Sequence, residues 1–350
     1  MDFNFTSDQD DLRGLARQIL TDVCTPEHLK AIAATDSGFD MDLWRSMAAA
    51  GLVGIELPSS DDVGGGGLGF IETCIVLEEC ARVAAPVPGL AVMALAVGAL
   101  AARPDLLAGV ADGSTIVTAA LHEGVGDPSV PYTVVTDGRL SGEKVCVPAG
   151  LAACCFVVSA ADGLYLVDAG AEGVSIERQD TTTGIPEARV TFTSAPAEKI
   201  GDLAALAALI ERASTAAAVM VSGHCAAAVA LTATYVKTRQ QFDRPIASFQ
   251  AVSQRTADAY IDTEGVRLTS WQAAWRLAEG RPAAEQVLTA KFWAAEGGQR
   301  VVHAAQHLHG GFGVDRDYPL HRHFLNVKQL ELFLGSATPS LAKLGRILAG

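Results

Sequence analysis

The sequence predicts an α+β fold in which a β-rich segment lies between two helical ones. Apolar, alanine-rich runs with helix-capping signals fill residues 1–113 and 201–350. Between them, residues 114–200 carry short β-branched runs separated by Gly, Asp and Pro, which is typical of strands. A chain of 350 residues is long enough for two or three domains. We therefore predict an N-terminal helical domain (1–113), a middle β domain (114–200) and a C-terminal helical domain (201–350).

The composition is that of a globular, acidic protein. Hydrophobic residues make up 49% of the chain and charged residues 19%, which argues against disorder. A net charge of −14 argues against nucleic acid and anionic membrane surfaces as partners. An anionic ligand would therefore have to be bound by a local cluster of basic groups.

Cysteine usage and the apolar runs indicate a cytoplasmic protein without membrane spans. The seven cysteines show no paired spacing, and the adjacent Cys154 and Cys155 are poorly placed for a disulfide. Residues 1–8 lack the basic and apolar regions of a signal peptide. The apolar runs 83–102 and 213–236 are interrupted by Pro or rich in Ala, Ser and Thr, so we interpret them as buried helices.

Helix-start signals place the N-terminal helices. Thr6 and Gln9 form a capping-box pattern before a helix over 8–23, and Asp40 can cap a helix over 41–50. Thr25 is predicted to cap a helix that begins at Pro26, with Glu27 in its first turn, and further helices are predicted over 70–84 and over 89–102.

A glycine-rich loop precedes the helix over 70–84. Gly64, Gly66 and Gly69 formally match the dinucleotide fingerprint G-x-G-x-x-G. The polar residues 59–62 separate the loop from the nearest strand-like run, however, and no βαβ alternation follows. We interpret it as a connection between helices.

The middle segment has the pattern of strands. Asp137-Gly138 is a strong signal for a tight turn. The predicted strands cover 115–121, 132–135, 144–147, 155–159, 164–167 and 189–193.

The C-terminal helices are predicted over 202–238, 249–279, 282–308 and 339–349. The first of them is apolar or small on nearly every face, so we expect it to be central and buried. Trp271 and Trp275 lie four residues apart on one helix face, where packing is their expected role.

The turn between residues 239 and 250 carries the most informative residues. Pro245 stops the preceding helix, and Ser248 is a plausible N-cap for the next one. Arg239 offers a guanidinium suited to a phosphate, close to Phe242 and Gln250. From these residues alone, a cofactor site and a plain αα-hairpin with a solvated Arg both remain open.

The pattern R-x-x-F-x-x-P-I-x-x-F-Q over 239–250 resembles the signature turn of acyl-CoA dehydrogenases, and the stretches 307–313 and 318–322 resemble a second family motif. The resemblance covers essentially the whole chain and implies the acyl-CoA dehydrogenase fold, with a C-terminal four-helix bundle. It also implies FAD as cofactor and an acyl-CoA as substrate. The residues that would contact the FAD of a neighbouring subunit are Arg239, Phe242, Gln250, His307, Gly310 and Gly311. His307 stands where family members usually carry Gln.

The catalytic base of the family is missing. The reaction requires a carboxylate that removes a proton from the α carbon while hydride passes to the flavin. The resemblance places that base at one of two positions, and these hold Leu334 and Ala213. Glu211 and Glu331 are the nearby acids that could substitute, although Glu211 lies about 200° around the helix from Ala213.

The middle domain departs from the family as well. The loop that usually lies against the flavin reads Leu-His-Glu-Gly-Val-Gly-Asp-Pro over 121–128, and the strand beside the ring reads Cys-Val-Pro over 146–148. The chain thus departs from the family in the half-site for the flavin ring but keeps the residues that contact the FAD of a neighbouring subunit. In this it resembles the non-catalytic β subunits of heterotetrameric bacterial acyl-CoA dehydrogenases. The stretches 23–28, 42–44 and 318–322 look most like those acting on steroid side chains, of the cholest-4-en-26-oyl-CoA type.

The resemblance therefore implies an α2β2 assembly with a catalytic α subunit, and an electron-transfer protein as acceptor. Two alternatives remain open. One is an autonomous acyl-CoA dehydrogenase that uses Glu211 or Glu331, and the other is a scaffold that binds neither FAD nor CoA.

A metal site is not predicted. His303 and His307 have the i, i+4 spacing of zinc ligands, but the intervening residues lack the Glu of H-E-x-x-H and no third ligand is evident.

Overall fold

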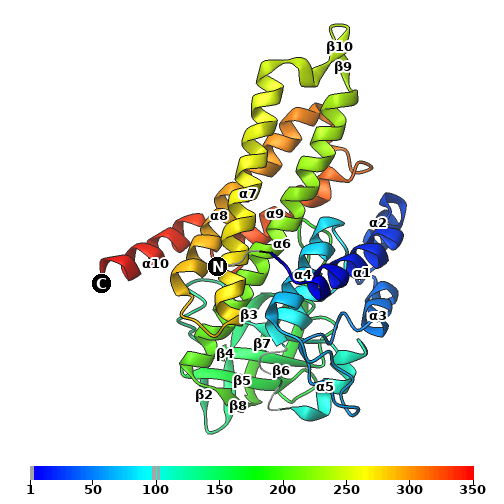
Figure 1. Ribbon diagram of the computed structural model, residues 1–350. Helices are drawn as coiled ribbons and strands as arrows, with labels where there is room; N and C mark the ends of the chain where they lie inside the picture. Colours follow the sequence, from blue (N-terminus) through cyan, green and yellow to red (C-terminus); the bar gives the residue numbers. More distant parts are fainter. Residues whose placement is uncertain (1–3, 97–99, 101–102) are drawn as a thin grey trace. The chain divides into compact units, whose positions relative to one another are not determined.

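The computed structural model describes residues 4–96, 100 and 103–350, which form two compact units. Unit 1 comprises Met1–Ala31, Cys74–Ala85 and Ser214–Gly350, and unit 2 comprises Ile32–Thr73 and Pro86–Ala213. The predicted middle β domain, 114–200, lies entirely within unit 2. Helices and strands are both well represented, so the α+β prediction is confirmed (Figure 1).

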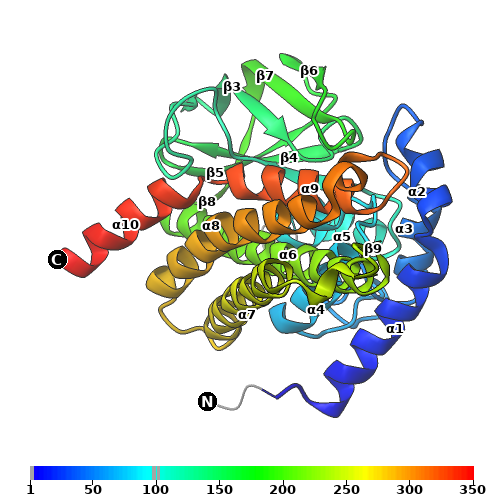
Figure 2. The same cartoon turned by 90° about the horizontal axis from the view of Figure 1, so that it is seen from above.

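Unit 1 is built around long helices that run side by side, as the view from above shows (Figure 2). The complete helices of this unit are α1 (Ser7–Val23), α7 (Gln250–Ala278), α8 (Ala284–His309), α9 (Leu320–Leu332) and α10 (Ala337–Ala349). Most of α6 (Leu203–Thr238) belongs to this unit, as do the later part of α4 (Phe70–Arg82) and most of α2 (Pro26–Ala33).

Helix α6 is central and buried, as predicted. Its residues 213–219 and 221–225 are all buried, because small side chains let neighbouring helices come close. A Cβ atom added at Gly223 would lie 2.4 Å from the carbonyl oxygen of Glu78, so only glycine fits there. By length and composition α6 is the one helix of the described residues that could cross a membrane, but 61% of its most apolar window is buried inside the protein.

Local capping signals predicted three helix starts correctly and one wrongly. Thr25 Oγ1 accepts from the His28 amide at 3.2 Å at the start of α2. The Thr6–Gln9 capping box opens α1, and the Asp40 carboxylate accepts from the Leu43 amide at 2.9 Å at the start of α3 (Met41–Ala49). Ser248 does not cap α7. It lies in the short 3₁₀ turn η3 (Ile246–Ser248), where its hydroxyl donates to the Pro245 carbonyl at 2.8 Å.

Unit 2 contains two four-stranded sheets. Their strands are β1 (Val117–Ala120), β2 (Val134–Thr136), β3 (Arg139–Val147), β4 (Cys155–Ala160), β5 (Gly163–Asp168), β6 (Val174–Gln179), β7 (Glu187–Pro196) and β8 (Glu198–Gly201). One sheet has the order β1-β4-β5-β8, with β1 and β4 parallel, and the antiparallel second sheet has the order β2-β3-β7-β6. Phe156 of the first sheet meets Phe192 of the second edge to face, 6.3 Å between ring centroids, in the shared core.

The predicted tight turn is present between β2 and β3. Asp137 and Gly138 both have positive φ, 51° and 74°, as a type I′ hairpin turn requires. The sequence missed the strands β6 and β8, which are the outermost strands of the two sheets. It also missed the helices α5 (Pro104–Ala111) and α9. The helix predicted over 89–102 is the π-helix η1 (Leu90–Ala96) in its described part, and residues 97–99 and 101–102 of that prediction lie outside the described residues.

A buried ion pair ties the first loop of the middle segment to β3. The Lys144 side chain is 0% exposed, and its ammonium donates to Glu123 at 2.8 Å and to the Ser159 hydroxyl at 2.9 Å. The Glu123 carboxylate also accepts from the Thr133 hydroxyl and from the amides of Tyr132 and Thr133. This set of bonds fixes the loop 121–133 against the sheet.

Candidate functional site

The turn after α6 is a strained β-hairpin at one end of the helix bundle. The strands β9 (Gln240–Gln241) and β10 (Arg244–Pro245) pair antiparallel, which leaves Phe242 and Asp243 as the two loop residues (Figure 1). Their φ angles are 54° and 61°, the left-handed region that costs a non-glycine residue roughly 1–2 kcal/mol. Phe242 is also 86% exposed. Backbone strain that presents an aromatic ring to solvent points to a binding role for that ring.

Arg239 precedes this hairpin and presents an uncompensated charge. Its amide donates to the Tyr235 carbonyl at 2.8 Å, and its carbonyl accepts from the Ile246 amide at 2.8 Å, so the backbone is held on both sides. The side chain is exposed and makes no hydrogen bond or ion pair with any described residue. A guanidinium placed in this way is available for a phosphate from outside the chain.

An aromatic cluster joins the end of α6 to the end of α8. The His309 ring stacks on Tyr235, with 4.4 Å between centroids and an interplanar angle of 25°. His309 Nδ1 donates to the Ala305 carbonyl at 2.8 Å, so Nε2 accepts from the Tyr318 hydroxyl at 3.1 Å. Phe312 packs against both Tyr235 and Tyr318. The second motif stretch therefore packs against the end of α6, four residues before Arg239.

The other predicted cofactor residues also lie at this end. Gln250 is the first residue of α7, and His307 lies in the last turn of α8; both are exposed. Gly310 ends α8 with φ 60° and ψ −135°, a conformation close to glycine-only space. Added Cβ atoms at Gly310 and Gly311 would meet nothing within 4 Å, so the backbone there is open to a ligand. The structure thus brings the second motif stretch to the end of the bundle that carries the Arg239 hairpin.

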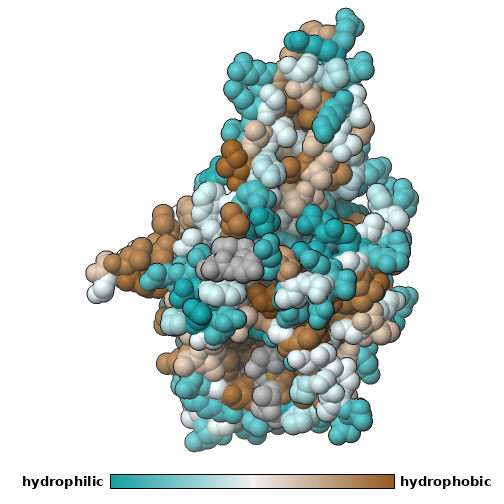
Figure 3. All heavy atoms as spheres, in the orientation of Figure 1, coloured by the Kyte–Doolittle hydropathy of each residue, from teal (hydrophilic) through white to brown (hydrophobic). Residues whose placement is uncertain are grey.

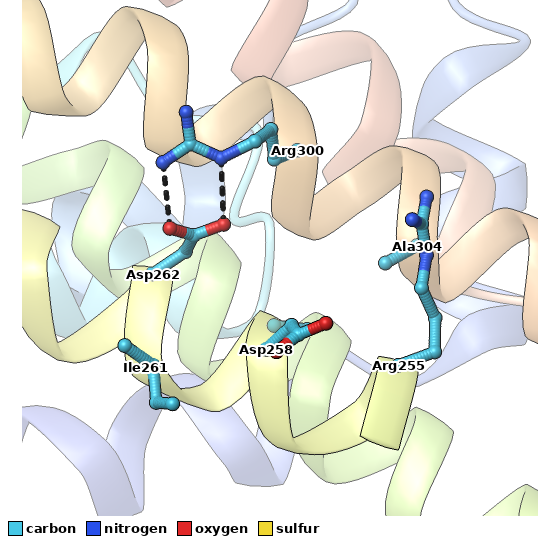
Figure 4. A pocket seen from close by; sticks show the side chains of 7 residues that line it. Arg255, Asp258, Ile261, Asp262, Arg300 and Ala304 are labelled. Carbon is cyan, nitrogen blue, oxygen red and sulfur yellow. Dashed lines mark hydrogen bonds and ion pairs between the residues drawn. The ribbon is translucent and has the colours of Figure 1, made fainter. Parts of the chain in front are cut away.

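A groove of about 320 Å³ runs between α7 and α8, beginning about one turn from Gln250 and His307 (Figure 4). Arg300 closes one side of it by two hydrogen bonds to Asp262, at 2.8 and 2.6 Å. Arg255 and Asp258 reach into the same space from α7 (Figure 4). Opposite charges side by side favour a polar protein surface or a neutral group in this groove over a phosphate.

The two positions predicted for the catalytic base hold aliphatic side chains. Leu334 is 6% exposed in the turn after α9, with φ 57°, and Ala213 is 0% exposed on α6. Leu334 belongs to unit 1 and Ala213 to unit 2. Neither side chain can accept a proton.

The substitute acids differ in their surroundings. The Glu331 side chain is buried, and its carboxylate accepts from the Lys328 ammonium at 2.6 Å, so it already has a partner within α9. Burial raises the pKa of the half-buried Glu211, a shift that suits a general base. Glu211 projects from another side of α6 than Ala213, because two residues turn a helix by about 200°.

A buried lysine holds the end of α9 just before Leu334. The Lys291 side chain is 2% exposed, and its ammonium donates to the carbonyls of Leu330 and Glu331, both at 2.9 Å. These carbonyls belong to the unsatisfied last turn of a helix, where a cation is favourable. Burial nevertheless lowers the pKa of Lys291 to about 7.

Because the pKa of Lys291 is lowered in the folded protein, the free energy of unfolding should depend on pH. Between pH 7 and 10 the unfolded chain keeps a proton that the folded Lys291 has released, so the free energy of unfolding should rise with pH. We expect a slope of up to about 1.4 kcal/mol per pH unit in the wild type relative to Lys291→Met. Urea unfolding at several pH values measures it. Parallel curves for both proteins would show that Lys291 titrates normally.

The half-site expected to hold the flavin ring is occupied by internal bonds. The Glu123 carboxylate accepts hydrogen bonds from the Lys144 ammonium and the Thr133 hydroxyl. Cys146 has φ 52°, and its amide donates to the Gln179 side chain at 2.7 Å. Within unit 2, these bonds occupy the Glu123 carboxylate and the Cys146 amide, which are two of the polar groups in the segments 121–128 and 146–148.

Two other sequence patterns have structural explanations. The amides of Gly65, Gly66 and Gly67 donate to the carbonyls of Pro58, Gly54 and Leu57, so the glycine-rich loop folds onto its own chain. His303 packs edge-on against Phe324, with 5.0 Å between ring centroids.

Several residues that shape this end of the bundle were not predicted from the sequence. Tyr235 and Phe312 contact each other across a long stretch of chain, and no local pattern signals such a pair. Lys291 was also missed, although a lone lysine inside an apolar helix stretch was a usable signal.

Comparisons with known proteins agree with this arrangement. The family model described as acyl-CoA dehydrogenase, N-terminal domain, matches residues 6–112, and the model described as acyl-CoA dehydrogenase, C-terminal domain, matches residues 203–347. The chain is 40% identical to the acyl-CoA dehydrogenase FadE27 of Mycobacterium tuberculosis (strain ATCC 25618 / H37Rv), over 100% of this chain and 99% of the relative.

Two solved structures are similar over nearly the full length. The Tcur3481-Tcur3483 steroid ACAD G363A variant is 44% identical, with a TM-score of 0.92 and coverage of 98% of both chains. A chain of the ChsE4-ChsE5 complex from Mycobacterium tuberculosis is 39% identical, with a TM-score of 0.92 and coverage of 100% of this chain and 99% of that one.

Proposed function

Since this chain belongs to the acyl-CoA dehydrogenase family of oxidoreductases, we propose that it is the non-catalytic β subunit of a heteromeric member of that family. In this proposal it pairs with a catalytic α subunit in an α2β2 assembly and completes the FAD site of that partner. FAD, when bound, accepts the hydride that leaves the β carbon of an acyl-CoA.

The observation that carries this proposal is the aliphatic character of both base positions, Leu334 and Ala213. A chain with no carboxylate at either position has to obtain the base elsewhere. Both similar structures pair two protein names, Tcur3481 with Tcur3483 and ChsE4 with ChsE5, and the second is a complex, which supports a second polypeptide as the source of the base.

The residues of unit 1 fit the nucleotide half of FAD. Arg239 supplies an unpaired guanidinium for the pyrophosphate, and Phe242 and Gln250 are exposed beside it. Gly310 and Gly311 leave room for close approach, and His307 lies within one turn of them. We propose these six residues as the contacts to FAD bound mainly by the partner, because the ring half-site of this chain is occupied by internal bonds.

Exposed apolar side chains further support a partner subunit. On α10, Leu341 is 52% and Leu348 67% exposed, and Figure 3 shows the helix as a largely apolar surface. Phe242 adds an exposed ring at the hairpin. Apolar surface of this kind marks protein–protein contacts more often than free surface.

The substrate proposed is a steroid side-chain CoA thioester of the 3-oxo-cholest-4-en-26-oyl-CoA type, with an electron-transfer protein as acceptor. Support comes from the likeness to the Tcur3481-Tcur3483 protein, which is a steroid ACAD. A reduced, cytoplasmic location belongs to the same proposal, since all seven cysteines lie in the described part of the chain as thiols.

Separate and joint purification tests the proposal. The chain alone is expected to carry less than stoichiometric FAD and to show no dehydrogenation of the steroid CoA thioester with an artificial electron acceptor. Co-expression with its α subunit should restore both. Stoichiometric FAD and turnover in the isolated chain would contradict the proposal.

One observation favours an alternative, an autonomous enzyme with a displaced base. Burial raises the pKa of Glu211 towards the range of a working general base. If the isolated chain dehydrogenates an acyl-CoA, the variants Glu211→Gln and Glu331→Gln would identify the base. The variant that replaces the base should lose several orders of magnitude in kcat.

A further inference from the structure

A second pocket, of about 170 Å³, lies in unit 1 where α2 meets the segment between the end of α8 and α9 (Figures 1 and 2). Its lining includes the cations Lys30, Arg316 and Arg322 and the carboxylates Glu27 and Asp317. The pocket is therefore net cationic on a chain whose net charge is −14. None of these residues belongs to the proposed FAD contacts.

Of the three cations in the pocket, only Lys30 forms an ion pair with a described residue. Lys30 Nζ lies 2.5 Å from Asp317 Oδ1, which neutralises that carboxylate and joins α2 to the segment before α9. Arg316 and Arg322 make no side-chain hydrogen bond, ion pair or aromatic contact with any described residue. Two guanidinium groups, with five N–H donors each, thus line the pocket without a protein acceptor.

Arg322 is the unusual member of this pair. Among the described arginines that make no such contact, Arg239, Arg255, Arg316 and Arg346 are exposed, and only Arg322 is half-buried. Burial lowers the pKa of Arg322, in agreement with the absence of an ion-pair partner among the described residues. A charged group without a partner in a partly dry site is costly, and a bound anion would offset that cost.

The charges of Arg316 and Arg322 also act on the neighbouring His321. Its Nδ1 donates to the Tyr318 carbonyl at 2.7 Å, which fixes the ring on the wall of the pocket. Burial lowers the pKa of His321, and the positive charges of Arg322 and Arg316 lower it further.

We propose that this pocket binds a phosphate group, with Arg322 as the principal ligand and Arg316 as a second donor, beside the Lys30–Asp317 ion pair on the pocket wall. The planar guanidinium fork of Arg322 matches two phosphate oxygens. A pocket of 170 Å³ is large enough for one such group and its hydration waters. Inorganic phosphate and the phosphate of a nucleotide such as CoA share this chemistry.

Titration calorimetry of the purified complex with inorganic phosphate, at constant ionic strength and with chloride as the background anion, tests the proposal. One phosphate per chain of this protein is expected to bind to the wild type. Arg322→Gln should weaken binding at least tenfold, about the loss of one charge-assisted hydrogen bond. Arg346→Gln removes the same charge from an exposed position on α10 and should leave binding unchanged.

A second variant, Arg316→Gln, distinguishes a loss of phosphate binding from a folding defect in Arg322→Gln. Arg316 is exposed and its side chain makes no hydrogen bond, ion pair or aromatic contact with a described residue, so Arg316→Gln should fold normally and still weaken phosphate binding. Absence of phosphate binding in the wild type, or equal affinity in Arg322→Gln, would overturn the proposal. So would a result in which Arg322→Gln leaves phosphate affinity intact and instead weakens association with the α subunit, since the pocket would then be a subunit contact.

Competition identifies the source of the phosphate. Displacement of inorganic phosphate by CoA, but not by 3′-dephospho-CoA, would assign the pocket to the 3′-phosphate of a CoA molecule. Phosphate binding that neither compound disturbs would assign it to the free anion. Either result agrees with a phosphate-binding site in this pocket.

Discussion

Replacing Arg239 by Ala in the purified complex is expected to weaken FAD binding by about 2–4 kcal/mol, roughly 30- to 1000-fold in Kd. Arg239 is exposed, carries no ion pair within the described chain and is held by backbone bonds on both sides. Truncation therefore removes the proposed phosphate contact without breaking a side-chain hydrogen bond or ion pair of the described chain. Flavin absorbance per complex, and FAD titration of the stripped protein, measure the loss.

Two further variants make this result specific. Lys237→Ala removes the same charge from an exposed position two residues earlier in the chain. We expect less than about a threefold effect, because solvent and salt weaken an exposed charge that makes no direct contact with the ligand. Arg239→Lys keeps the charge but not the guanidinium fork, so an intermediate affinity is expected. Unchanged flavin content in Arg239→Ala would favour the scaffold alternative, in which the chain contributes nothing to FAD binding.

Features that depend on adjacent residues could be predicted from the sequence. Thr6 with Gln9, and Asp40 with the Leu43 amide, are hydrogen-bonded within three residues of each other. The Asp137-Gly138 turn follows from the ease with which these residue types adopt positive φ. Each signal is complete within a few residues, so tertiary contacts did not need to be known.

Ser248 shows where such local reasoning fails. A serine before a helical run is a good cap candidate, but the chain forms a 3₁₀ turn through Ser248 and begins α7 only at Gln250. Phe249 takes the N-cap position without a side-chain hydrogen bond. The hairpin before it places Phe242 and Asp243 at positive φ, and the bulky Phe242 at its first position does not predict a type I′ turn.

Long-range contacts explain what the sequence could not reveal about the candidate sites. Lys30 and Asp317 are 287 residues apart, yet they form one wall of the cationic pocket. Tyr235 and His309 likewise come together only because α6 and α8 end at the same place. Family resemblance identified the individual motif residues, but their proximity to one another came from the packing of the helices.

The largest effect on stability is expected from Lys144→Met, at about 3–5 kcal/mol, because the substitution leaves the Glu123 carboxylate without its counter-ion in a buried site. The two side chains are 0% and 11% exposed, with 2.8 Å between the charged atoms. Urea unfolding at pH 7 measures the loss. Lys199→Met is the matched control, because Lys199 forms a 2.7 Å pair with Asp162 in which both side chains are about half exposed. Such a surface pair contributes about 0–1 kcal/mol.

Acid unfolding separates the ion pair from simple packing. Burial alone would raise the pKa of Glu123, but hydrogen bonds from Lys144, Thr133 and the Tyr132 amide outweigh it and lower the pKa to about 2. The stabilisation is therefore complete above pH 4.5, the ordinary value, and is lost as the pH falls towards 2. In the double variant Glu123→Gln/Lys144→Met this component should vanish, and the cost at pH 7 should be smaller than that of Lys144→Met alone. Equal losses at pH 7 in the single and double variants would show that the methylene packing of Lys144, and not its charge, holds the loop.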